Sequence, residues 1–505
     1  MKNIFKYIFL TIAVISVSSC DDGFDELNTN KIAVTEIDPA FILNQALISS
    51  SFPTETVVFD MGVVQQIISP NSGVLAGANF NQENRSVFGQ LWPQYYRDVI
   101  RNVKDVINQS TESGNRNNLL QMARIVQANA FMVLTDRYGD IPYSEAGKGF
   151  SDGVVLPKYD KQQDIYKDII KELTEASAAL STSGKTEAAD ILYAGDVVKW
   201  KRLGYSLLLR AGMRLSEADA TAAKAAVAAA IAGGTMASND DNFRIKHDAN
   251  YQNPIGGMLN ASEANNFYMP KPFVDHLKNT NDPRLQSIAV RYVGAKSGPG
   301  QTADVAKTDP SLQIGIPMGN DNAGAVAAAA ADGLASFYDY SQIDRRRLAN
   351  NTAPMFFATY AQTQLLIAEA IVRGWSTGNA QEYYKSGIRA HMEQMALYNA
   401  SAAVPEASIQ AYLDANPLSA NPMKDIGTQY WIASLLNGPE AFANFRRTGY
   451  PQLAPNPYPL KDITGDFINR LTYPDSELSV NSTNVQAAIS QQGADNLDTK
   501  VWWDK

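Results

Sequence analysis

Two runs of amide and aromatic side chains carry the chemistry that this sequence offers most clearly. The first lies in residues 77–85 and the second in residues 251–268. Asparagine and glutamine amides both donate and accept hydrogen bonds, as sugar hydroxyls do, and aromatic rings can stack on sugar faces. These residue types predict noncovalent recognition of a polar ligand, with candidate contacts at Asn79, Phe80, Gln82, Arg85, Tyr251, Asn253, Asn265, Phe267 and Tyr268.

Each of these residues also has a structural explanation. Asparagine tolerates turn conformations, so it is common in loops that bind no ligand. Aromatic side chains often anchor long loops to a hydrophobic core, and for any single ring this explanation is at least as strong. Both interpretations stay open for each residue.

No local motif indicates catalysis. The sequence has no Gly-rich phosphate loop followed by Lys and Ser or Thr, no Gly-x-Ser-x-Gly turn and no His-Glu-x-x-His helix. The histidines His247, His276 and His391 stand in unrelated contexts, so we expect structural roles rather than metal binding. A pair of catalytic carboxylates, as in a glycoside hydrolase, stays open because the spatial separation of 52 acidic residues is invisible in a sequence.

We therefore expect no enzyme, no cofactor and no catalytic metal. The run Asn320–Gly324 is the one segment that suggests structural calcium, and it lacks the spaced oxygen ligands of an EF-hand loop. A calcium site there is unsupported.

Helices are expected to form the scaffold that positions the candidate residues, and residues 119–180 have the clearest helical pattern. An apolar stripe at three- and four-residue steps, from Leu119 to Val133, predicts a helix with one buried face. Gly139 tolerates positive φ and Pro142 cannot continue a helix, so this helix should end near Tyr138. Asp160 is predicted as the N-cap of a second helix whose own stripe packs against the first.

The same patterns predict paired helices along the rest of the chain. Asp196 and Asp219 are expected to cap two of them, and others should cover residues 354–373, 380–398, 422–436 and 439–447. Residues 235–353 have scattered Asn, Gly and Pro, and we expect a loop-rich insertion made of loops and short helices, with a short hairpin at 287–293. The sequence thus predicts a mostly α, tetratricopeptide-like stack of antiparallel helix pairs, in one domain spanning residues 38–505.

The N-terminus has the layout of a bacterial signal peptide in residues 1–19. Lys2 and Lys6 precede an apolar run over residues 8–17, which is shorter than the roughly 20 residues that span a bilayer. The sole cysteine, Cys20, follows two serines, and this junction resembles a lipobox. We expect Cys20 to be acylated and residues 20–37 to form a tether, each buried methylene contributing about 0.8 kcal/mol. An ordinary signal peptide with a chance cysteine is the alternative.

The net charge limits the kinds of partner that the protein is expected to bind. The net charge of −9 becomes −11 once Lys2 and Lys6 are removed with the leader. An acidic surface argues against nucleic acid and against an anionic membrane face.

Five separated motifs resemble the SusD/RagB family of nutrient-binding outer-membrane lipoproteins, and most closely its second large subfamily. They stand in the family's order at residues 136–143, 157–173, 368–370, 445–451 and 470–474. The acidic residues just after Cys20 also resemble surface-export signals of lipoproteins in Bacteroidetes-type bacteria.

The resemblance implies a lipoprotein on the outer face of the outer membrane that captures oligosaccharides or other nutrients. It implies a SusC-type TonB-dependent transporter as partner, and no catalysis. Ligand residues vary widely across the family, so none is carried over by motif. The alternatives are a helical-repeat surface adaptor that binds protein or peptide and, last, a glycoside hydrolase.

Overall fold

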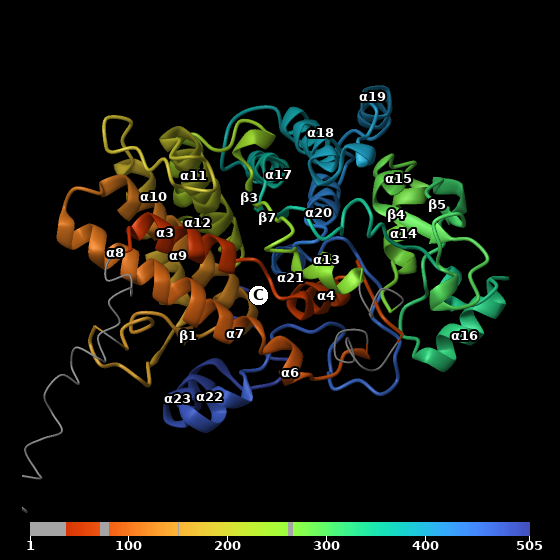
Figure 1. Ribbon diagram of the computed structural model, residues 1–505, viewed down its shortest axis with the longest axis horizontal. Coiled ribbons are helices and arrows are strands. Elements are labelled where there is room, and N and C mark those ends of the chain that lie inside the picture. Colours follow the sequence, from red (N-terminus) through yellow and green to blue (C-terminus); the bar gives the residue numbers. More distant parts are fainter. Residues whose placement is uncertain (1–36, 71–79, 150, 261–265) are drawn as a thin grey trace, which may run out of the picture. The chain divides into compact units, whose positions relative to one another are not determined.

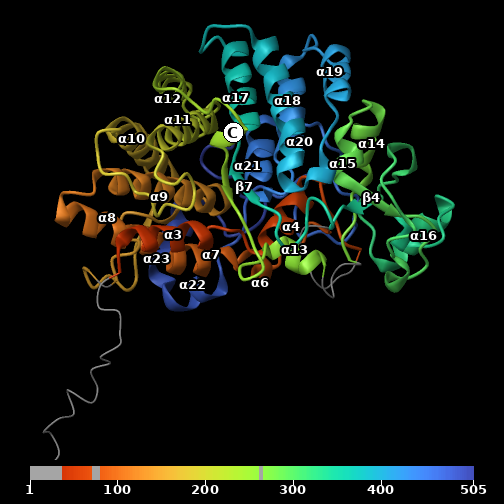
Figure 2. The ribbon, with the colours of Figure 1, turned by 45° about the horizontal axis from the view of Figure 1, so that its top comes forward.

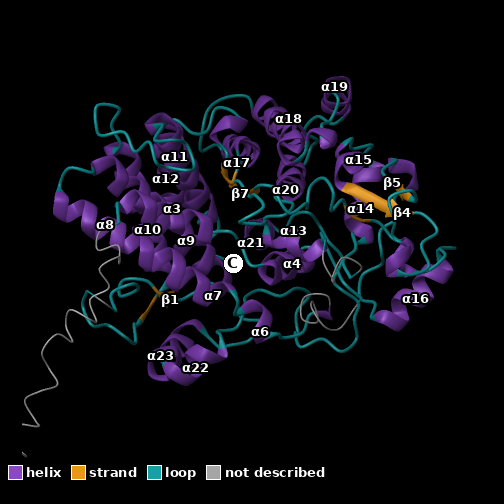
Figure 3. Ribbon diagram, viewed as in Figure 1, coloured by secondary structure: helices purple, strands orange, loops and turns teal. Residues whose placement is uncertain are grey.

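The computed structural model describes residues 37–70, 80–149, 151–260 and 266–505. Among these, residues 39–505 form one compact unit. Helices dominate it, and the strands are short pieces set between them (Figure 3). The predicted signal peptide, Cys20, Asn79 and Asn265 lie outside the described residues.

Helix α9 (Asn117–Tyr138) is the centre of the first helical stack. It ends at Gly139, whose φ is +81°, so the end predicted from Gly139 and Pro142 is confirmed. Successive helices pack side by side, α8 (Arg101–Ser113) on α9, α9 on α10 (Gln162–Ala179), and α10 on α11 (Val197–Arg214) (Figure 1). Helix α12 (Ala220–Gly233) packs on α11. The predicted caps Asp196 and Asp219 are confirmed, since each accepts hydrogen bonds from backbone N–H groups of the first turn.

The predicted cap of α10 is wrong. Asp160 lies on β2 (Tyr159–Asp160), which pairs antiparallel with β1 (Ile141–Pro142). Its carboxylate accepts hydrogen bonds from the backbone N–H groups of Tyr143 and Ser144, at 3.2 and 2.7 Å, and holds that turn instead. The backbone N–H of Gln162 donates to Asp140 Oδ1 at 2.8 Å, so the helix start is satisfied from across the loop.

Asp140 also makes a pH-dependent contribution to stability. Burial raises its pKa to about 6, whereas an unfolded chain has an aspartate pKa of about 3.9. The ionised carboxylate therefore destabilises the fold once the pH rises from about 4 through 6. We expect Asp140→Asn, which can still accept from Gln162, to match the wild type near pH 4 and to be more stable by about 1–3 kcal/mol at pH 7.5. Urea unfolding at both pH values measures this, and a difference that does not change with pH would contradict it.

The second stack is formed by α17 (Tyr360–Val372), α18 (Ala380–Tyr398), α20 (Pro422–Ala433) and α21 (Gly438–Thr448), and Figure 2 shows the first three side by side. The predicted helix over 354–373 begins later than expected. Met355–Ala358 is strand β7, which pairs with β3 (Phe243–Ile245), and Thr359 then starts α17 with a capping box to Gln362. A short apolar run fits a strand as well as a helix, which explains the error.

Residues 235–353 hold short helices and strands joined by loops. The hairpin predicted at 287–293 is wrong, because Ala289–Tyr292 is β4, the central strand of a three-stranded sheet. Its partners β5 (Ala306–Lys307) and β6 (Gln342–Ile343) both come from later in the chain. The other helical pieces of this region are η2 (Asn239–Asp241), α13 (Pro254–Leu259), α14 (Lys271–Asn279), α15 (Arg284–Ile288), η3 (Gly298–Gly300), η4 (Pro310–Leu312), α16 (Asn322–Ala331) and η5 (Phe337–Asp339).

The two ends of the unit pack against helices of both stacks. At the start, α3 (Pro39–Ser49) packs on α8, and α4 (Thr54–Val63) packs on α21. Trp503, near the last residue, is fully buried and its indole N–H donates to Asp136 Oδ1 of α9 at 2.9 Å. The remaining helices are α6 (Arg85–Phe88), α7 (Leu91–Gln94), the π-helical turn η1 (Tyr95–Ile100), η6 (Ala400–Ala402), α19 (Glu406–Ala415), α22 (Asp475–Val480) and α23 (Ser482–Gln492).

Candidate functional site

The first predicted group is tied to the C-terminal part of the chain. The ring of Phe80 is 2% exposed and its centroid lies 4.3 Å from that of Tyr458. Gln82 Nε2 donates to the carbonyl of Leu460 at 2.7 Å. Arg85, the first residue of α6, donates to the carbonyl of Tyr473 and to Asp495. Of the three, Gln82 and Arg85 keep part of their side chains at the surface.

The second predicted group is held by other segments. The hydroxyl of Tyr251 donates to the carbonyl of Ile48 at 2.7 Å, and its ring stacks on His247. Asn253 is buried as the N-cap of α13. Phe267 and Tyr268 are at most 2% exposed, and Tyr268 forms a β-bridge with Ile68. Apart from Tyr251, the described members of this group are packed within the fold.

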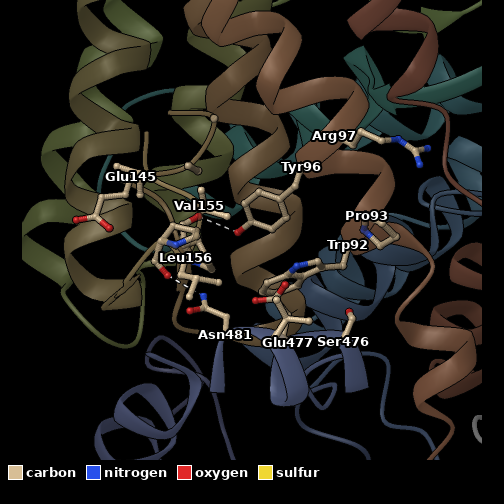
Figure 4. A pocket seen from close by; sticks show the side chains of 16 residues that line it. Trp92, Pro93, Tyr96, Arg97, Glu145, Val155, Leu156, Ser476, Glu477 and Asn481 are labelled. Carbon is tan, nitrogen blue, oxygen red and sulfur yellow. Dashed lines mark hydrogen bonds between the residues drawn. The ribbon is translucent and has the colours of Figure 1, made fainter. Parts of the chain in front are cut away.

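A groove of about 380 Å³ lies beside the first stack, and Figure 4 shows the side chains that line it. Helices α7 and η1 form one side with Trp92, Pro93, Tyr96 and Arg97. The chain from the end of β1 to just before β2 forms a second side, and we call its residues 142–149 and 151–157 the strap. Helix α22 and its C-cap close the third side with Ser476, Glu477, Val480 and Asn481.

Internal hydrogen bonds fix the walls of the groove. The hydroxyl of Tyr96 donates to the carbonyl of Pro142 at 2.8 Å, and Asn481 Nδ2 donates to the carbonyl of Pro157 at 2.8 Å (Figure 4). Each bond joins the strap to a helix. Behind this surface the ring of Trp92 packs against Tyr159, whose hydroxyl donates to Glu477 Oε2 at 2.8 Å. The groove is therefore formed before any ligand arrives.

The groove contains carboxylates that can accept hydrogen bonds from the hydroxyl groups of a ligand. Burial, and then the carboxylate of Glu477, raise the pKa of Tyr96, so its hydroxyl stays protonated at neutral pH. Glu145 and Glu477 each accept one internal hydrogen bond, from Lys158 N–H and from Tyr159, and a carboxylate can accept several. Glu145 and Glu477 can therefore accept further hydrogen bonds from a ligand.

The same groove has an apolar rim. Val155 is 79% exposed, Val480 68% and Leu156 50%, although valine and leucine are usually buried. An apolar rim beside carboxylates and an amide suits a ligand that has apolar C–H faces and polar edges. A pyranose ring has both.

The sequence offered little that could have identified this groove. Trp92 lies on α7 and Tyr96 on η1, where the sequence alone gives no sign that distinguishes them from core residues of a helix. Their partners come from the strap and from α22, more than 300 residues apart in the chain. Adjacent aliphatic residues, Val155 and Leu156, in a segment between helices were a weak signal, and their exposure is evident only in the structure.

Within the described residues, no three His, Cys, Asp or Glu side chains come together in a way that would hold a metal ion. None of the described helices is both long enough and apolar enough to cross a bilayer.

Taken together, the stacked helix pairs place the chain in the class of tetratricopeptide-like helical proteins, as predicted. Residues 30–474 match a family described as SusD-like, starch-binding and associating with the outer membrane. The chain therefore belongs to the SusD-like family, and to the subfamily that its motifs predicted. Membership implies a carbohydrate ligand and association with the outer membrane.

Solved structures agree with this assignment. A chitin-binding protein is 32% identical, with a TM-score of 0.82, over 93% of this chain and 100% of that one. A SusD homologue from Bacteroides fragilis is 26% identical, with a TM-score of 0.76, over 93% and 100%. A chitin-binding SusD homologue from Flavobacterium johnsoniae shares the fold at 24% identity, with a TM-score of 0.74, over 92% and 98%. A comparison with curated protein sequences found no match.

Proposed function

We propose that the protein is a surface lipoprotein that captures oligosaccharides and delivers them to a SusC-type TonB-dependent transporter, without catalysis. The family match over residues 30–474 is the observation that carries this proposal. Acylation of Cys20 would hold the protein at the membrane, and mass spectrometry of the purified N-terminal peptide tests whether it carries the lipid. Co-purification of the transporter from outer membranes tests the partner.

The groove between the strap, η1 and α22 is the proposed glycan site. Its aliphatic rim would contact the C–H faces of a sugar, while Glu145, Glu477 and Asn481 would receive its hydroxyl groups. Its volume of about 380 Å³ lies within the range of roughly 300–1,000 Å³ that is usual for ligand sites. The predicted loop residues remain the second set of proposed contacts, and Gln82, Arg85 and Tyr251 are the accessible ones among those that the structure describes.

The names of the relatives support a proposal for the ligand class. The 32% identical structure is named a chitin-binding protein, and the family description names starch. We therefore propose a neutral glycan, and chito-oligosaccharides and malto-oligosaccharides are the first two series to titrate. Measurable release of reducing sugar over hours would instead indicate a glycoside hydrolase.

The groove can be tested with substitutions on its exposed rim. The double variant Leu156→Ser and Val480→Ser should bind glycan about tenfold more weakly, because contact with two aliphatic side chains is worth about 1–2 kcal/mol. Both side chains are at least half exposed, so melting should not change. Isothermal titration calorimetry measures the affinity.

The matched control carries the same kind of change elsewhere. Val198 and Val326 are 45% and 57% exposed on α11 and α16, and Val198→Ser with Val326→Ser should bind like the wild type. Unchanged binding by the rim variant would move the site to the loop surface. Failure of the wild type to bind either series would refute the glycan proposal.

A further inference from the structure

A second groove, of about 510 Å³, runs along the first helical stack. Helix α9 forms its floor, and α8 and α10 form its walls. Each helix contributes side chains three, four or seven positions apart, which places them on one face. The lining residues are Lys104, Ile107 and Thr111 of α8, Leu120, Arg124 and Gln127 of α9, Asp168 and Glu172 of α10, and Tyr143 and Ser144 of the strap.

Most charges in this groove are already paired. Arg124 Nε lies 2.8 Å from Glu172, and its Nη2 lies 2.7 Å from Glu175. The hydroxyl of Tyr143 donates to Asp168 at 2.7 Å, and Lys171 lies within 4.0 Å of both Asp168 and Glu172. An acidic or basic ligand would have to break these pairs, so the lining favours a neutral one.

Two polar groups of the groove lack partners among the described residues. Gln127 is 7% exposed, and its buried Oε1 accepts no hydrogen bond. The ammonium group of Lys104 has no carboxylate within ion-pair distance, although burial beneath the strap lowers its pKa. Its side chain lies so close to the strap that a Cβ on Gly147 would be 2.9 Å from Lys104 Cγ. Buried polar groups are normally hydrogen-bonded, so an acceptor left unpaired beside an open groove points to a ligand.

We propose that this groove is a second saccharide subsite for a neutral glycan. One ligand hydroxyl would pair with the amide of Gln127 once that side chain turns toward the groove, another would accept from Lys104, and a pyranose face would lie on Ile107 and Leu120. This inference rests on the proposed glycan-binding function. The strap lines both grooves, through residues 143 and 144 here and residues 145–147 in the first groove. Two subsites on one strap would raise the avidity for a long polymer.

Gln127→Leu and Lys104→Met test the proposal separately. Neither substitution removes a hydrogen bond or an ion pair of the free protein, so the melting temperature should stay the same or rise. Calorimetric titration with tri-N-acetylchitotriose and with maltotriose should give two sites per wild-type chain for the ligand that binds. In each variant the affinity of the second subsite should fall at least tenfold, so that the titration detects only one site.

Controls separate the possible outcomes. Lys167→Met removes an exposed lysine of α10 and should retain both sites. The rim variant Leu156→Ser and Val480→Ser should retain the second subsite while weakening the first. One site in the wild type, unaffected by Gln127→Leu and Lys104→Met, would overturn the inference and leave the proposed function standing. No binding of either trisaccharide by the wild type would overturn both. If Gln127→Leu fails to fold, Lys104→Met decides.

Discussion

Replacing Trp503 by alanine is expected to lower the free energy of unfolding by about 3–5 kcal/mol, the usual cost of removing a buried tryptophan. The side chain is fully buried, and its indole N–H donates to Asp136 Oδ1 at 2.9 Å. The guanidinium carbons of Arg214 and Arg446 lie 5.5 and 4.8 Å from its ring centroid. The variant would leave a cavity, and the carboxylate of Asp136 would lose one hydrogen-bond donor. Urea unfolding followed by circular dichroism measures the change.

Trp502 is the matched control for this substitution. It is the neighbouring residue and the same type, but it is only partly buried at the edge of the core. Trp502→Ala should therefore cost about 1 kcal/mol or less, since little area is removed from the interior. Equal losses for the two variants would show that the tail contributes through its overall packing and not through the Trp503 contact.

Trp503 also shows where sequence reasoning reached its limit. Helix ends were predictable from local chemistry, as at Gly139, Asp196 and Asp219, because caps and breakers act within a few residues. The contact between residues 503 and 136 joins distant parts of the chain, and no local pattern encodes it. The wrong cap at Asp160 has the same cause, since a pairing of β1 with β2 took over its carboxylate.

Prediction of the candidate sites had the same limit, because residue types are local and exposure is not. The sequence predicted which residue types could recognise a glycan, but not which of them would be exposed. Phe80 and Phe267 have the right chemistry, yet Tyr458 covers the ring of Phe80 and the core surrounds Phe267. Exposure depends on tertiary packing, which amide and aromatic composition does not determine. The two grooves became visible only when the strap was placed between α8, η1 and α22.

Arg214→Met is expected to destabilise the fold by about 3–5 kcal/mol, because it removes the one guanidinium that pairs with both of two buried carboxylates. Arg214 Nε lies 3.1 Å from Asp136, and Nη2 lies 2.7 Å from Glu440. Arg210 and Arg214 together hold the pKa of Glu440 below its usual range despite burial, which tends to raise it. The ionised carboxylate of Glu440 therefore stabilises the fold above about pH 4.5, and this contribution is lost as the pH falls below that value.

The control and the pH dependence make this prediction specific. Arg202 is on the same helix, 3.3 Å from Asp241, but its side chain is 38% exposed, so Arg202→Met should cost less than about 1 kcal/mol. The loss of stability in Arg214→Met should shrink as the pH falls from 7 towards 4, because protonation removes the uncompensated charges.

The double variant Arg214→Met with Trp503→Ala should lose less stability than the sum of the two single losses, because both side chains bind Asp136. Full additivity in urea unfolding would mean that Asp136 does not couple the C-terminal tail to α11.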